Sequence, residues 1–135
     1  EGTVDYAQTP PTGGDHAQAW LNCGIYTETQ TNENAVHSLE HGAIFVYYLP
    51  ESAGGVPQAI VDRLATLAQD ERATFLAPYP NLSADRALTL TAWNRRQSCP
   101  VGEELTPERA VTIVSGFVEA FRCTSNAPEG SSPPC

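Results

Sequence analysis

Residues 34–49 read NAVHSLEHGAIFVYYL, and this stretch decides how the rest of the chain must fold. Residues 43–49 are apolar, and β-branched and aromatic side chains prevail, which is typical of a strand buried on both faces. Just before this run lie His37 and His41, with Glu40 between them. A separation of four residues places the two imidazoles on one side of either a helix or a strand. The sequence therefore predicts a central strand that begins beside a histidine pair.

The position of Glu40 depends on which local structure forms. On a helix it projects near both histidines and gives the H-x-x-E-H arrangement of some zinc peptidases, in which the glutamate is the general base. On a strand it points to the opposite face. Asn32 or Asn34 can cap a short helical turn, and Gly42 suits a helix end. We therefore consider a short helical turn over residues 37–41.

The charge of the chain excludes several classes of partner. Among 135 residues, 16 are acidic and 7 are basic, which gives a formal net charge of −9. Such a balance repels phosphate backbones and anionic lipid, so we expect no nucleic-acid partner. No segment approaches the roughly 20 apolar residues that cross a bilayer, so we expect no membrane insertion. A metal ion and a protein partner remain open.

Two helices are predicted downstream of the central strand. The first begins at Pro57, and the second begins at Thr106 as N-cap with Pro107 next. Each carries an apolar stripe at helical spacing, formed by Ile60, Val61, Leu64 and Leu67 in the first and by Val114, Phe117, Val118 and Phe121 in the second.

Further strands are predicted at residues 74–77 and 87–93, and a short one at 23–27. In residues 87–93 apolar side chains alternate with threonine, which predicts a strand buried on one face. The order of elements predicts an α+β fold, with a mixed sheet of about four strands covered by two helices. Its C-terminal half resembles a thioredoxin-like fold. We expect one domain over residues 1–135, with an ordered approach loop at 1–19 and an irregular tail at 124–135.

The four cysteines indicate disulfides and an oxidising compartment, because their number is even and the domain is small. We favour a bond between Cys99 and Cys123, which would tie the loop after the last strand to the end of the last helix. Cys23 would then pair with Cys135 or remain free. The expected location is extracytoplasmic, as a secreted, periplasmic or membrane-tethered protein.

The three histidines of the chain predict a metal site. His16, His37 and His41 fall within 26 residues, and the last two have chelating spacing. Three neutral imidazoles suit zinc, copper(II) or nickel. Cys23 is the candidate fourth ligand, and its thiolate would favour copper or zinc.

Four segments together resemble the successive signatures of one family, the bacterial domain of unknown function 3105. They are Pro11-Thr12-Gly13-Gly14-Asp15-His16, Val36-His37-Ser38-Leu39-Glu40-His41-Gly42-Ala43, Ala77-Pro78-Tyr79-Pro80 and Leu90-Thr91-Ala92-Trp93. The resemblance runs from about residue 10 to the tail at residues 127–129. It implies an extracytoplasmic domain whose histidine motifs are its signature, and it supplies no function.

The sequence thus predicts an extracytoplasmic protein that binds a transition metal, with copper preferred and zinc next. Its role would be metal binding, delivery or sensing. Two alternatives stay open. One is a zinc-dependent hydrolase with Glu40 as general base, and the other is a non-catalytic interaction module whose histidines are structural.

Overall fold

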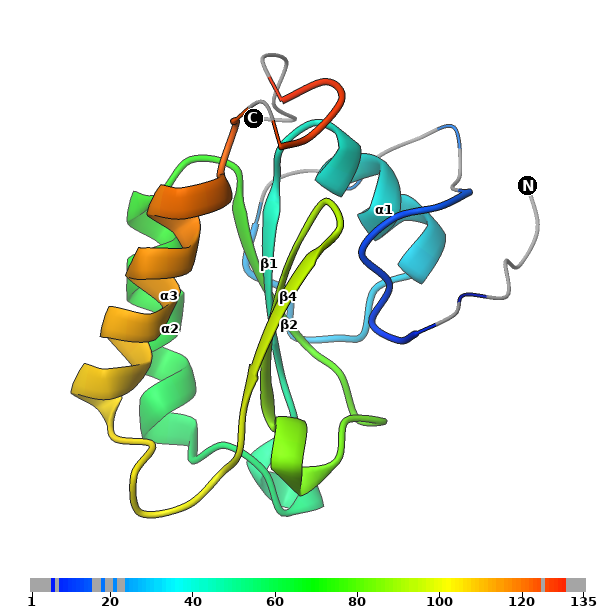
Figure 1. Cartoon of the computed structure of the whole chain (residues 1–135). Helices are drawn as coiled ribbons and strands as arrows, with labels where there is room; N and C mark the ends of the chain where they lie inside the picture. The colour runs from blue at the N-terminus through cyan, green and yellow to red at the C-terminus, as the bar shows by residue number, and fades with distance from the viewer. Residues whose placement is uncertain are drawn as a thin grey trace.

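A computed structural model of the protein shows an α+β fold in three layers (Figure 1) and describes residues 6, 8–15, 18, 21, 24–124 and 126–130. The helices α2 (Gln58–Asp70) and α3 (Pro107–Phe121) cover one face of a four-stranded sheet, and α1 (Asn32–Glu40) lies on the other face. The sheet has the order β2-β1-β3-β4, with β1 (Ile44–Tyr48), β2 (Thr74–Pro78), β3 (Leu88–Ala92) and β4 (Arg95–Cys99). The predicted fold class is confirmed, and the likeness to a thioredoxin-like fold stays a prediction.

Strand β1 lies inside the sheet, as its apolar sequence predicted. It pairs with β2 in parallel and with β3 in antiparallel orientation. The connection from β1 to β2 runs through α2, which is the crossover that a parallel pair requires. All five residues of β1 are buried, so the strand contributes apolar side chains to both faces of the core.

The helices begin close to the predicted positions. Thr106 is the N-cap of α3, and its side-chain oxygen accepts a hydrogen bond from the Arg109 amide at 3.1 Å. Thr31 is the N-cap of α1, so the expected cap at Asn32 or Asn34 was wrong. The Thr31 hydroxyl instead bonds to the Asn34 side-chain oxygen. No helix in the described part of the chain is long and apolar enough to cross a membrane.

Strand β3 is buried on both faces, so the predicted half-buried strand was wrong. The alternation of leucine and threonine indicates one solvated face, yet α2 and α3 cover one side of the sheet and the layer of α1 covers the other. Thr89 tolerates burial because its hydroxyl donates to the Arg86 carbonyl at 2.8 Å and lies 3.0 Å from the Ser98 hydroxyl. The strand is buried on both faces because layers of helices cover both sides of the sheet, and the sequence of the strand itself does not show this.

Strand β4 was not predicted, because its sequence RRQSC has no apolar pattern. It forms as the second arm of a hairpin with β3, in the register Leu88↔Cys99 to Ala92↔Arg95. Asn94 in the turn has a φ of 55°, a conformation that asparagine accepts better than most residues. At residues 24–27, in contrast, the structure has only an isolated bridge between Ile25 and Leu76 rather than the predicted strand.

Cys99 and Cys123 are both free, so the predicted bond between them does not form. Cys99 lines a small hollow together with Ile113 of α3. Cys123 lies beyond the end of that helix, which continues eight residues past Ile113. At about 1.5 Å per residue this is about 12 Å, whereas a disulfide needs its Cα atoms within about 7 Å. Cys23 and Cys135 lie outside the described residues.

Two side-chain hydrogen bonds fix α1 against its surroundings. At its start, the Tyr79 hydroxyl donates to the Asn32 side-chain oxygen at 3.1 Å. In its last turn, the fully buried Ser38 hydroxyl accepts from the Leu21 amide at 2.9 Å and donates to the Leu21 carbonyl at 3.2 Å. Ser38 therefore joins the N-terminal loop to the helix that carries the histidines.

Replacing Ser38 by alanine should lower the free energy of unfolding by roughly 1–2 kcal/mol, because the amide and carbonyl of Leu21 lose their partner in a partly buried place. Urea denaturation followed by circular dichroism measures this loss. Ser52→Ala removes a hydroxyl from an exposed site and is the matched control. Equal stability of the two variants would contradict the anchoring role of Ser38.

Candidate metal centre

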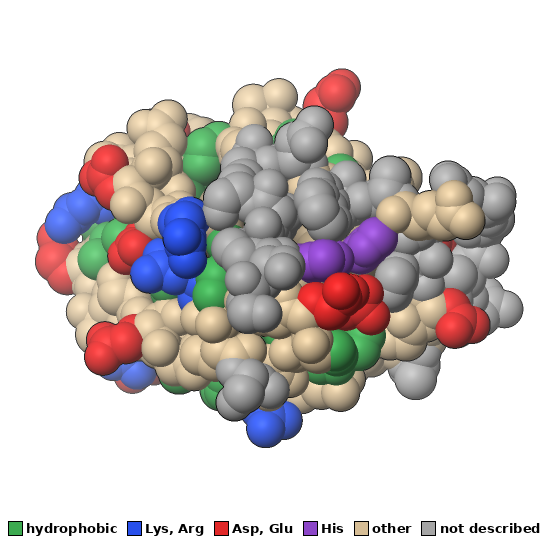
Figure 2. All heavy atoms as spheres, turned by 90° about the horizontal axis from the view of Figure 1, so that it is seen from above, with side chains coloured by type: hydrophobic (Ala, Val, Ile, Leu, Met, Phe, Trp, Pro, Cys, Tyr) green, Lys and Arg blue, Asp and Glu red, His purple; other side chains and the backbone are tan. Residues whose placement is uncertain are grey.

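The side chains of His37, Glu40 and His41 lie together at the C-terminal end of α1. One ligand atom from each can be chosen so that all three lie within 4.8 Å of one another. The two imidazole ring centres are 5.1 Å apart, and the rings are tilted by 38°. Figure 2 shows the two described histidines side by side at the surface, with acidic side chains directly beside them. The helical alternative for this stretch is the correct one.

The end of α1 places His41 where it can join this group. His41 is the C-cap residue, with φ −89° and ψ 14°. The Gly42 amide then donates to the Leu39 carbonyl at 2.9 Å, and the Ala43 amide donates to the Ser38 carbonyl at 3.1 Å. These two bonds, with Gly42 at a φ of 89°, are the Schellman arrangement that ends many helices. The predicted role of Gly42 as a helix end is confirmed.

The three side chains differ in exposure. His41 is buried, with 7% of its surface exposed, whereas His37 and Glu40 are half-buried. The group therefore has one wall inside the protein and one open toward solvent. An ion held there would be reachable from outside the molecule.

A fourth polar side chain, Glu129, lies beside this group and was missed by sequence reasoning. Its carboxylate Oε2 is 3.5 Å from Nε2 of His41. The Glu129 amide also donates to the Glu40 carbonyl at 2.9 Å. Residues 126–130 contain no helix or strand, so no periodic pattern marks the contact. The only signal is that residues 127–129 close the resemblance to the family described above.

We call residues 123–130, without residue 125, the C-terminal segment, and it lies against the end of α1. The Cys123 amide donates to the Gly42 carbonyl at 3.0 Å. Farther along, the Asn126 side-chain amide donates to the Trp93 carbonyl at 2.7 Å, and Ala127 is buried with 4% exposure. Although the sequence shows no packing signal here, the segment is bound at both ends.

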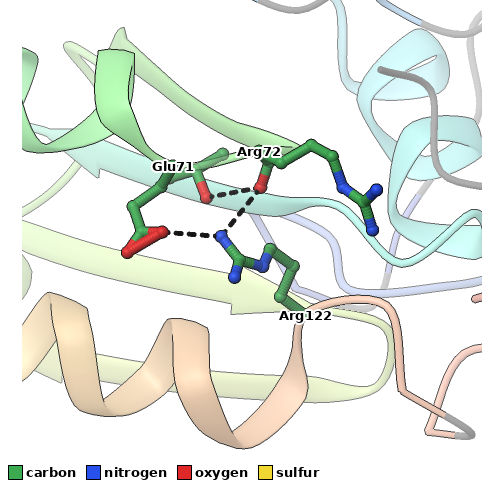
Figure 3. A network of polar contacts seen from close by, with 4 residues as sticks. Glu71, Arg72 and Arg122 are labelled. Atoms are coloured by element: carbon green, nitrogen blue, oxygen red, sulfur yellow. Dashed lines mark hydrogen bonds and ion pairs between the residues drawn. The ribbon is translucent and has the colours of Figure 1, made fainter.

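Arg122 fixes the point from which the C-terminal segment starts. Its guanidinium donates to the Glu71 carboxylate at 2.8 Å and to the Arg72 carbonyl at 3.2 Å (Figure 3). Both partners lie between α2 and β2, so the end of α3 is held across the top of that pair. Cys123, the next residue, is consequently held where its amide reaches the Gly42 carbonyl.

Two predicted ligands, His16 and Cys23, lie outside the described residues. The structure therefore brings together His37 and His41 of the predicted set and adds Glu40. A separate hollow of about 730 Å³ is lined by Gly24, Ile25, Asp70, Arg72 and Thr74, among others. None of its lining residues belongs to the histidine group, so the two features are distinct.

The chemistry of the group fits a transition-metal ion. Two imidazoles and a carboxylate are ligands that zinc and copper(II) accept, at about 2.0–2.2 Å in zinc sites. Two ligand atoms at that distance from one tetrahedral ion lie about 3.3–3.6 Å apart. The present separations, of up to 4.8 Å, are longer, so the side chains have to move closer together to hold an ion. Three ligands leave one position of a tetrahedral ion for a further group.

Comparison with known proteins supports the resemblance seen in the sequence. The family model described as "Protein of unknown function (DUF3105)" matches residues 1–134. A search of curated proteins and a search of solved structures each found no match.

Replacing Gly42 by alanine should lower the free energy of unfolding by about 2–4 kcal/mol, because two costs add. The residue has a positive φ, and an added Cβ would lie 2.8 Å from Cα of Cys123. Gly54→Ala is the matched control, since Gly54 has a φ of 81° and nothing within 4 Å of an added Cβ. It should cost about 1 kcal/mol.

Chemical denaturation of both variants measures the difference between the two glycines. A loss at Gly42 no larger than the loss at Gly54 would show that the C-terminal segment does not press against the turn.

Proposed function

We propose that this chain, which belongs to the DUF3105 family, binds a transition-metal ion through His37, Glu40 and His41. The observation that carries the proposal is the convergence of three ligand atoms within 4.8 Å. Within the part of the chain that the structure describes, no other three such side chains come this close. Two imidazoles one helical turn apart, with a carboxylate near both, are a donor set that a transition-metal ion accepts.

Copper(II) is the preferred ion and zinc the second choice. Among divalent first-row ions, copper binds most tightly to sites of nitrogen and oxygen ligands, and nickel and zinc bind less tightly. The chain contains no methionine, so the thioether ligands that suit copper(I) are absent from the sequence. His16, 21 positions before His37 in the sequence, and Cys23 stay predicted ligands, and either would compete for the one position that His37, Glu40 and His41 leave on a tetrahedral ion.

Binding, delivery or sensing of the ion fits the site better than catalysis. In a hydrolase, the general base stands next to a metal-bound water and does not itself hold the metal. Here the Glu40 carboxylate lies among the ligand atoms, within 4.8 Å of both imidazoles. A site with half-buried His37 and Glu40 also lets an ion enter and leave.

We further propose that the protein works outside the cytoplasm. The support is the family resemblance together with the even number of cysteines. Because Cys99 and Cys123 are free, the even number of cysteines supports this location less than the family resemblance does.

Fractionation of the producing cells, with a cytoplasmic enzyme as marker, should place the protein outside that compartment. Recovery of the protein together with the marker would contradict the location.

The test of the metal site is titration of untagged protein with copper(II) and with zinc, by calorimetry against a competing chelator. Wild type should bind one equivalent, and His37→Ala should bind at least about tenfold more weakly, because even the loss of a residue that only orients a ligand costs about tenfold or more in affinity. His37 is half-buried, so the variant should keep its fold.

Glu119→Gln removes an exposed carboxylate from α3, far along the sequence from the site, and is the control for general charge effects. It should bind as wild type does. Wild-type protein that takes up neither ion, or equal affinity in all three proteins, would overturn the proposal and leave the histidines as structural groups of an interaction module.

A further inference from the structure

We infer that Glu129 supplies a further metal ligand from the C-terminal segment, so that the ion fastens this segment to the end of α1. The inference rests on the proposed function, because it assigns a fourth group to the same site. Its consequence is new: occupancy of the site and docking of residues 123–130 become one linked equilibrium.

The distance between Glu129 and His41 carries the assignment. Their Oε2 and Nε2 atoms are 3.5 Å apart, which is longer than the 2.7–3.2 Å of a good nitrogen-to-oxygen hydrogen bond. It matches the separation of about 3.3–3.6 Å between two ligands of one tetrahedral ion. The two atoms are therefore close enough to bind the same ion.

The backbone holds Glu129 at this place. The Glu129 amide donates to the backbone carbonyl of Glu40, and the side-chain carboxylate of Glu40 is one of the proposed ligands. A main-chain contact at 2.9 Å between residues 40 and 129 brings both carboxylates to the same end of α1. In the ion-free structure the Glu129 carboxylate contacts His41 but does not lie within 4.8 Å of the other two ligand atoms, so it has to swing toward them to fill the fourth position of a tetrahedral ion.

Charge makes the docking sensitive to the ion. The backbone contact between residues 40 and 129 places two carboxylate side chains at the same end of α1, in a chain with a formal net charge of −9. Like charges repel each other, and a divalent cation bound between two carboxylates reverses the sign of the interaction. Without the ion the segment keeps its backbone bonds and the 3.5 Å contact between Glu129 and His41, and the ion would add a direct bond to the Glu129 carboxylate.

Exposure identifies Glu129 as the ligand that can leave. Its side chain is 53% exposed, whereas that of His41 is 9% exposed. His37 lies in α1 and His41 caps it, whereas Glu129 lies in an irregular segment. Because binding and docking are linked, the factor by which docking strengthens metal binding equals the factor by which the metal strengthens docking. Such coupling suits a protein that delivers or senses an ion.

Zinc titration of Glu129→Gln against Glu119→Gln tests the ligand. Glutamine keeps the size of the side chain and removes its charge, and both positions are exposed, so neither variant should unfold. We expect Glu129→Gln to bind zinc about tenfold or more weakly than wild type, whereas Glu119→Gln should be unchanged. Equal affinities of both variants would overturn the inference.

Hydrogen exchange with and without zinc tests the linkage. In wild type, zinc should slow exchange of the Cys123 and Glu129 amides at least about tenfold, because a docked segment opens less often. The same amides in Glu129→Gln should respond much less, and amides in the middle of α2 serve as the internal reference. An unchanged segment in zinc-loaded wild type would overturn the inference.

The two proposals fail in different ways. If wild type binds no metal, both the metal site and the role of Glu129 fall. If wild type binds one equivalent and His37→Ala loses it, while Glu129→Gln behaves as wild type, the site stands and only the assignment of Glu129 falls.

Discussion

The rest of the structure depends on the close packing of the backbone at Gly42. There the Schellman bonds end α1, the chain turns into β1, and the Gly42 carbonyl accepts the amide of Cys123. No residue with a Cβ fits without displacing Cys123, whose Cα would lie 2.8 Å from it. One residue therefore joins a helix end, the start of the central strand and the C-terminal segment.

The same turn determines the geometry of the candidate metal centre. Because α1 ends at Glu40, His41 occupies the cap and faces the same side as His37. The turn also brings the C-terminal segment against the helix end, and with it Glu129. A metal ion at this place would offset some of the charge repulsion of a strongly acidic chain. The turn at Gly42 therefore determines both the local fold and the arrangement of the candidate metal ligands.

Layering explains where prediction from sequence failed. Strand β3 carries threonines that indicate a solvated face, yet helices on both sides of the sheet bury it. Strand β4 has no strand signal and forms because the chain reverses at Asn94 and pairs with β3. The bond expected between Cys99 and Cys123 does not form, because the part of α3 after Ile113 separates the two residues. Each error concerns the position of a segment relative to other parts of the chain, which its own residue pattern does not specify.

The sequence by itself determined the features that arise from local chemistry. The apolar run of β1, the capped start of α3, the helix end at Gly42, the α+β class and the family follow from residue types and their spacing. The tertiary structure alone decided that Glu129 meets His41, because the two are 88 positions apart and no periodic pattern links them. Backbone hydrogen bonds between irregular segments have no signature in side-chain sequence, so such a contact appears only when the chain is folded.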